Sequence, residues 1–118
     1  MEKIVRQSLL YDFYGELLTE HQKSIYEDVT MNDLSYSEIA GLNGISRQGV
    51  YDMIKRCDKI LEDYEAKLKL VERFVKAREK TENIKCRVMD IKGKNTNPEL
   101  NDTLDELSML TDELLDEF

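Results

Sequence analysis

Apolar side chains recur at helical spacing almost from the first residue of the chain. In residues 4–18 they stand three or four positions apart, which predicts an amphipathic helix with one apolar stripe facing a core. Gly15 falls inside this pattern and lowers helix stability relative to alanine, so we expect the helix to end near it. The stripe consists of Val5, Leu9, Phe13 (or Leu10 and Tyr14) and Leu17.

Two short helices follow, and each begins with a residue pair typical of a capping box. Thr19 precedes Gln22, and Ser35 precedes Glu38, by three positions. In each pair the first residue caps the helix and the second reaches back to it. We expect the second of these helices to be interrupted by Gly44. The inward residues are Ile25, Tyr26 and Val29 in the first helix and Ile39 and Ala40 in the second.

The longest periodic stretch begins after Ser46, which is placed to cap a further helix. Apolar residues then alternate steps of four and three positions, the spacing of a coiled-coil-like seam that requires a partner helix. Periodicity leaves open whether the helix continues past residues 67–69. The seam consists of Val50, Ile54, Cys57, Leu61, Tyr64, Leu68, Val71 and Val75.

The only linker that the sequence indicates lies at residues 93–98. At its end, Asn97 is placed to cap a last helix and Pro98 to open it. One stripe of this helix is apolar, and its other face is almost wholly acidic. The stripe consists of Leu100, Leu104, Leu107, Leu114 and Phe118.

These patterns predict an all-α protein with a helix-turn-helix domain at residues 1–66 and a C-terminal helical extension at residues 67–118. Apolar positions with no evident partner in the chain predict a homodimer. We expect the dimer interface to contain Leu61, Tyr64, Leu68, Val71, Val75, Leu104, Leu107 and Leu114.

Residues 35–55 carry the pattern of a helix-turn-helix motif. Ala40 is the small residue that the crossing of two helices requires, and Gly44 tolerates the positive φ of the turn. Ile45 is placed to close the corner from inside, while the second helix is anchored from beneath. The expected motif core is Ile39, Ala40, Gly44, Ile45, Val50 and Ile54.

The second helix of this motif would present its first turns to a ligand. Recognition helices contact base edges with their N-terminal residues and phosphates with their flanks. Arg47 is suited to guanine and Gln48 to adenine. The alternative is that both are merely solvated and that Tyr51 packs at an interface. The candidate DNA-binding residues are Ser46, Arg47, Gln48, Tyr51, Lys55 and Arg56.

The charge distribution restricts this interpretation. The 118 residues carry a net charge of -8, which excludes a generally basic nucleic-acid wrapper. The net charge is -5 in residues 1–54, +4 in residues 55–92 and -7 in residues 93–118. Asp52 lies one turn from Gln48 and would repel phosphate. With few cations near the motif, we expect tight DNA binding only from a dimer.

The sequence gives no support for a membrane protein, a secreted protein, a metal-binding protein or an enzyme. No apolar run approaches the roughly 20 residues of a membrane span, and the N-terminus lacks a signal-peptide core. Cys57 and Cys86 are isolated and indicate reduced thiols in a cytoplasmic protein. His21 is the only histidine, and the acidic runs lack calcium-loop spacing. We therefore expect no enzyme activity, no metal and no cofactor.

A larger set of positions matches a known family. It comprises residues 10–19 with Gln22, residues 33–35, residues 38–40, residues 46–56 and residues 61–68. On these positions the chain resembles the YlxM family of small bacterial proteins, whose helix-turn-helix is similar to region four of sigma factors. Genes of this family typically lie beside those for the signal recognition particle protein and its receptor. The resemblance implies a DNA-binding or regulatory role linked to that pathway.

Two positions depart from the family pattern. Relatives usually carry an apolar residue where this chain has Asn43, which leaves the register of the first motif helix open or requires Leu42 to fill the core. Relatives also tend to have alanine at the position of Gly49, where glycine costs roughly 1 kcal/mol of helix propensity.

Three functions compete on this basis. The leading hypothesis is a dimeric, cytoplasmic, sequence-specific DNA-binding regulator. The second is an adaptor that binds the signal recognition particle protein or its RNA instead of DNA, which the acidic last helix favours. The third is that the motif is only a packing scaffold.

Overall fold

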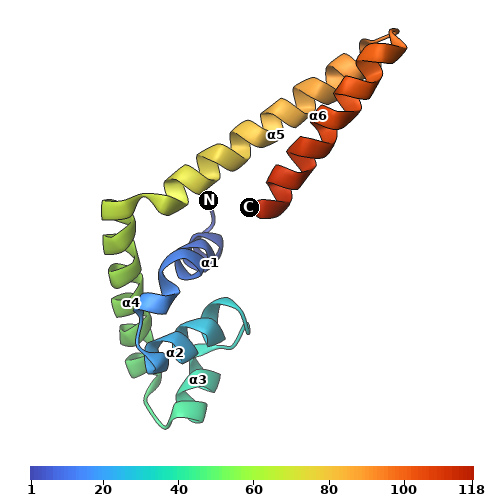
Figure 1. Ribbon diagram of the computed structural model, residues 1–118. Helices are drawn as coiled ribbons and strands as arrows, with labels where there is room; N and C mark the ends of the chain where they lie inside the picture. The colour runs from blue at the N-terminus through green and yellow to red at the C-terminus, as the bar shows by residue number, and fades with distance from the viewer. The chain divides into compact units, whose positions relative to one another are not determined.

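The computed structural model describes all residues 1–118, and its regular elements are all helices (Figure 1). The chain divides into two compact units, Met1–Val71 and Glu72–Phe118. None of the helices has the length and apolar character needed to cross a bilayer. In chain order the elements are α1 (Lys3–Tyr14), the 3-10 helix η1 (Gly15–Leu17), α2 (Glu20–Thr30), α3 (Tyr36–Asn43), α4 (Arg47–Leu68), α5 (Leu70–Lys94) and α6 (Pro98–Glu117).

In the first unit α4 is the central helix, and α1, α2 and α3 all pack against it (Figure 1). The unit has one core, to which all four helices contribute buried side chains. The most deeply buried apolar residues, each with an exposed fraction of 2% or less, are Leu10, Tyr14, Ile25, Tyr26, Ile39, Val50, Ile54, Cys57, Leu61 and Val71.

The helix starts confirm the caps expected from the sequence. Thr19, Ser35, Ser46 and Asn97 each accept a backbone N–H of the first turn of the helix that follows. The capping box is complete at Thr19 and at Ser35. These side chains satisfy donors that a helix start leaves without an intrahelical partner, so the boundaries are set locally.

The first helix ends next to Gly15, as expected, rather than running to residue 18, and its inward face is the alternative one. α1 stops at Tyr14, where η1 begins. Leu10 and Tyr14 are buried, whereas Val5, Phe13 and Leu17 are exposed. The stripe built on Val5 is therefore wrong. The polar Gln7, in register with Leu10 and Tyr14, is buried as well.

The long seam is divided between two helices, because Lys69 adopts a left-handed backbone conformation with φ 56° and ends α4. A buried carboxylate holds this junction. Glu65 accepts the hydroxyl of Tyr14 at 2.6 Å and the backbone N–H of Val71 at 3.0 Å. The Tyr14 oxygen in turn accepts the N–H of Leu70 at 3.1 Å. The first turn of α5 thus obtains hydrogen-bond acceptors from α1 and α4.

Part of the expected dimer interface lies inside the chain. Leu61, Val71 and Leu104 have exposed fractions of 0%, 2% and 8%, so these three have almost no surface for a second copy. For Leu61 the reason is that α1 supplies the partner helix that the α4 seam requires. Leu68, Leu107 and Leu114 remain exposed, and Tyr64 and Val75 are half-buried.

The second unit is an antiparallel pair of helices, α5 and α6 (Figure 1). Two ion pairs join them, Lys85 with Asp112 and Lys92 with Asp105. The connection is shorter than the linker expected from the sequence, because α5 continues through Gly93. The predominantly basic α5 and the acidic α6 are therefore neighbours in this unit.

Candidate nucleic-acid interface

A tight turn joins α3 to α4. Gly44 has φ 64° and ψ 31°, and its N–H donates to the Ala40 carbonyl. The N–H of Ile45 donates to the same carbonyl at 3.1 Å. Ser46 then caps α4, its Oγ accepting the N–H of Gly49 at 3.0 Å. This is the geometry of a helix-turn-helix, in which a left-handed glycine ends the first helix and a serine caps the start of the second.

The residues around the turn differ from expectation at two positions, Leu42 and Ile45. Leu42 is 73% exposed and does not fill the core. Ile45, expected to close the corner from inside, is 36% exposed. Asn43 is half-buried and donates its side-chain N–H to the Ile39 carbonyl at 2.8 Å. A polar side chain therefore completes the end of α3 by hydrogen bonding where an apolar one would pack.

The remaining core residues of the motif lie beneath the two helices. Ile39, Ala40, Val50 and Ile54 are all buried. They leave the opposite side of α4 to solvent, which is where the first turns of the helix present their polar side chains. The exposed residues on that side are Ser46, Arg47, Gln48, Tyr51, Lys55 and Arg56.

An open hollow of about 630 Å³ lies at the start of α4. Its lining consists of Tyr36 from α3 and of Arg47, Gln48 and Tyr51 from α4. Sequence reasoning missed Tyr36, although its place in the first turn of α3 was a usable signal. The two tyrosine rings lie 6.2 Å apart at an angle of 58°. The hollow thus combines aromatic surface with a guanidinium and an amide.

Two side-chain contacts organise the polar groups of this surface. Gln48 donates its amide N–H to Asp52 at 3.0 Å, so Asp52 orients Gln48 along the helix. The Lys55 ammonium lies 5.2 Å from the centre of the Tyr51 ring, within the range of a cation–π contact. No acidic residue stands in the first turn of α4, whose N-terminus carries the positive end of the helix dipole. Arg47 therefore extends from an electropositive helix end.

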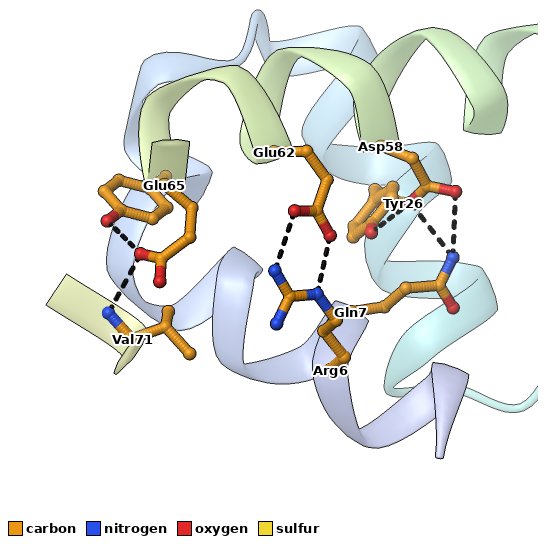
Figure 2. Close-up of polar contacts among 8 residues, drawn as sticks. Arg6, Gln7, Tyr26, Asp58, Glu62, Glu65 and Val71 are labelled. Carbon is orange, nitrogen blue, oxygen red and sulfur yellow. Dashed lines mark hydrogen bonds and ion pairs between the residues drawn. The ribbon is translucent and has the colours of Figure 1, made fainter. Parts of the chain in front are cut away.

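A row of three carboxylates holds α4 against the rest of the first unit (Figure 2). Asp58, Glu62 and Glu65 stand about one turn apart on one side of α4. Glu62 accepts two hydrogen bonds of 2.7 Å from Arg6. Such a two-pronged pair fixes direction as well as distance, so it orients α4 relative to α1.

Asp58 accepts hydrogen bonds from both α1 and α2. It accepts the hydroxyl of Tyr26 at 2.6 Å and both its oxygens accept from Gln7, at 3.0 and 3.1 Å. A single carboxylate thereby links α1, α2 and α4 (Figure 2). Together with the apolar core, these contacts make the base of the motif rigid.

The electrostatics of the first unit follow from burial and from these pairs. Hydrogen bonding to Arg6 lowers the pKa of Glu62. Burial, reinforced by the bond to Asp58, raises the pKa of Tyr26 far above its ordinary value. Burial also raises the pKa of the Cys57 thiol to about 11. These groups therefore stay in the forms that the packing requires at neutral pH.

The turn, the exposed start of α4 and the three helices beneath it define a helix-turn-helix protein. The chain belongs to the UPF0122 family, described as "Putative helix-turn-helix protein, YlxM / p13 like", whose sequence profile matches residues 1–101. This confirms the resemblance and the fold class inferred from the sequence. The family is described by its helix-turn-helix and not by any enzyme activity.

Curated relatives carry the same family name. A UPF0122 protein of Caldanaerobacter subterraneus subsp. tengcongensis is 51% identical over 78 residues, which cover 66% of this chain and 67% of that protein. One from Thermoanaerobacter pseudethanolicus is 43% identical over 107 residues, 91% of this chain and 92% of the relative. One from Geobacillus sp. (strain WCH70) is 40% identical over 110 residues, 93% and 98% of the two chains.

Proposed function

We propose that this protein is a cytoplasmic, homodimeric regulator that binds duplex DNA through the first turns of α4 and takes part in the signal recognition particle pathway. The observation that carries the proposal is the hollow at the start of α4, where Arg47, Gln48 and Tyr51 are exposed together on a firmly held helix. Membership of a helix-turn-helix family supports nucleic-acid binding. The proposed role in the signal recognition particle pathway rests on the resemblance to the YlxM family.

The chemistry of the hollow fits a base edge with phosphates on either side. The Arg47 guanidinium can donate two hydrogen bonds to guanine in the major groove. Gln48, already oriented by Asp52, offers its amide to adenine. Lys55 and Arg56 lie further along α4 and supply positive charge for the phosphate backbone. The helix therefore carries both sequence-reading and position-fixing groups.

A salt titration of DNA binding tests the proposal. We expect fluorescently labelled duplexes, selected from a random pool by the purified protein, to bind more weakly as salt rises. Arg47→Ala should lower affinity for the selected sequence by about 5- to 150-fold. Lys67→Ala, which removes one positive charge from the last turn of the same helix, is the matched control and should change affinity little.

The second candidate function is an adaptor that binds the signal recognition particle protein or its RNA. The charge of the C-terminal segment favours it, because residues 93–118 carry a net charge of -7 and suit a basic partner. An adaptor would show no retention on duplex DNA at any salt concentration. Absence of binding to every duplex of the pool at low salt would therefore refute the DNA-binding proposal.

A further inference from the structure

The α5–α6 pair buries few of its own apolar residues. Between the two helices, Val88 and Leu104 are buried together with Thr81 and Thr111. The Phe74 and Phe118 rings meet edge to face at the end of the pair, 5.5 Å apart. Two of these four buried residues are threonines, so the contact between the helices uses few of the leucines of α6. Most large aliphatic side chains of this unit therefore lie elsewhere.

Those side chains gather on one side of the helix pair, which we name the leucine face. A helix turns about 100° per residue, and the ion pairs of Lys85 and Lys92 mark one side of the pair. Residues one position before these lysines lie about 100° away, on the other flank of the buried Thr81 and Val88. Residues two positions after Asp105 and Asp112 lie about 200° away from these aspartates. The leucine face comprises Ile84 and Ile91 of α5 and Leu100, Leu107, Leu110 and Leu114 of α6, exposed by 42% to 54%.

The two long edges of the leucine face carry opposite charge. On the α5 edge Lys80, Arg87 and Lys94 follow one another at intervals of seven residues, and all three are exposed. On the α6 edge the exposed residues are acidic, and helical geometry aligns them on one side. These are Glu99, Glu106 and Glu117. An apolar strip with one basic and one acidic border has the pattern of a coiled-coil interface.

We propose that the leucine face docks against the leucine face of a second copy of this chain, with α5 lying over α6 of the partner. This deepens the dimer named in the proposed function, but it rests on the second unit alone. A two-fold axis parallel to the helices brings each basic edge against an acidic edge. An axis across the helices would instead place basic edge on basic edge, which like charges oppose. Charge complementarity therefore selects a second copy and one arrangement of it.

The register of the helix pair supports the same arrangement. Because residue 85 pairs with 112 and residue 92 with 105, residue 80 lies level with 117. A parallel two-fold axis preserves this height, so Lys80 lies level with Glu117 of the partner subunit. Arg87 is then about one turn from Glu106 of the partner subunit. The four helices enclose the leucines, which neither copy can cover alone.

Sedimentation velocity of the full chain without DNA tests this arrangement. We expect the unaltered protein to be a dimer at micromolar concentration. Lys80→Glu with Arg87→Glu reverses the basic edge, and Glu106→Lys with Glu117→Lys reverses the acidic edge. Each double variant alone should dimerise at least about tenfold more weakly, because both contacts then join like charges. An equimolar mixture of the two variants should form a mixed dimer, because both of its contacts join opposite charges.

The controls separate this inference from its alternatives. Asp102→Lys with Asp116→Lys makes the same charge change on the ion-pair side of α6 and should leave the dimer intact. A monomeric unaltered chain would overturn the inference, as would two variants that dimerise normally or a mixture that fails to associate. DNA binding is measured separately with Arg47→Ala, which lies outside the leucine face, so either proposal can fail without the other.

Discussion

Gly15 illustrates how a single residue can be kept for packing where its intrinsic preference argues against it. A Cβ added there would lie 2.8 Å from the ring of Tyr11, a distance that side chains do not tolerate. The Tyr11 ring is buried and cannot move freely, because its hydroxyl donates to Glu27 at 2.5 Å. The glycine therefore permits the close approach of the 3-10 turn to the ring.

We expect Gly15→Ala to destabilise the first unit by about 1–3 kcal/mol, through overpacking against the Tyr11 ring. Gly41→Ala is the matched control, because a Cβ at that exposed position in α3 meets nothing within 4 Å. It should raise stability by about 0.5–1 kcal/mol. Denaturant unfolding followed by tyrosine fluorescence measures both. Equal effects of the two substitutions would contradict the packing argument.

The sequence contained the local features of the fold at residue resolution. Ser35, Ser46 and Gly44 act as predicted, because caps and left-handed turns depend on side chains only a few positions apart. The sequence alone does not decide between the two possible inward faces of α1, since Leu10 and Phe13 are both apolar. The choice depends on tertiary contacts, with Gln7 buried by its bonds to Asp58 on α4. The spacing of apolar residues gives no sign of a hydrogen bond between polar side chains on different helices.

At the scale of elements, the junction of α4 and α5 rests on Glu65. Its carboxylate accepts the Tyr14 hydroxyl and the Val71 N–H, both largely shielded from water. We expect Glu65→Ala to destabilise the first unit by about 1–3 kcal/mol, because it leaves two buried donors without this acceptor. Chemical denaturation of the purified protein measures the change.

Glu65→Gln is the informative companion variant. Both hydrogen bonds go to the same carboxylate oxygen, Oε1, and an amide oxygen in its place can accept them, so this variant should lose less stability than Glu65→Ala. Equal losses would indicate that the side chain acts by packing and not as an acceptor. Sequence periodicity could not place the break between α4 and α5, because a glutamate in a helix is usually solvent-exposed and gives no sign that it is buried at a junction.

At the scale of the whole chain, the position of the tyrosines makes the two units distinguishable by spectroscopy. All six tyrosines lie in the first unit, and the chain has no tryptophan. Tyrosine absorbance and fluorescence therefore report that unit alone, whereas helical circular dichroism reports both units. The candidate site could be predicted as a set of exposed residues on α4, but the aromatic contribution of Tyr36 depends on how α3 folds back toward α4.

Stability of the first unit should fall at alkaline pH. Burial raises the pKa of Tyr11, Tyr14 and Tyr26 above the value of about 10 in an unfolded chain. The neutral phenols therefore stabilise the fold fully below pH 10, and this contribution is lost as the pH rises further. Tyrosinate absorbance and unfolding free energy across this range measure the effect.

Tyr26→Phe should weaken the alkaline dependence, because it removes one of the three phenols whose pKa burial raises. Tyr51→Phe changes an exposed hydroxyl and serves as the control, which should unfold over the same alkaline range as the unaltered chain. An unchanged alkaline limb in Tyr26→Phe would contradict the assignment.

The contrast between the two cysteines provides a built-in probe. Cys86 is exposed, whereas Cys57 has an exposed fraction of 0% and a pKa raised to about 11. A thiol-directed dye should therefore attach at Cys86 alone under native conditions, with no engineered site needed. Incorporation of a second dye molecule would time the opening of the first unit, and its rate would measure how often the base beneath the helix-turn-helix comes apart.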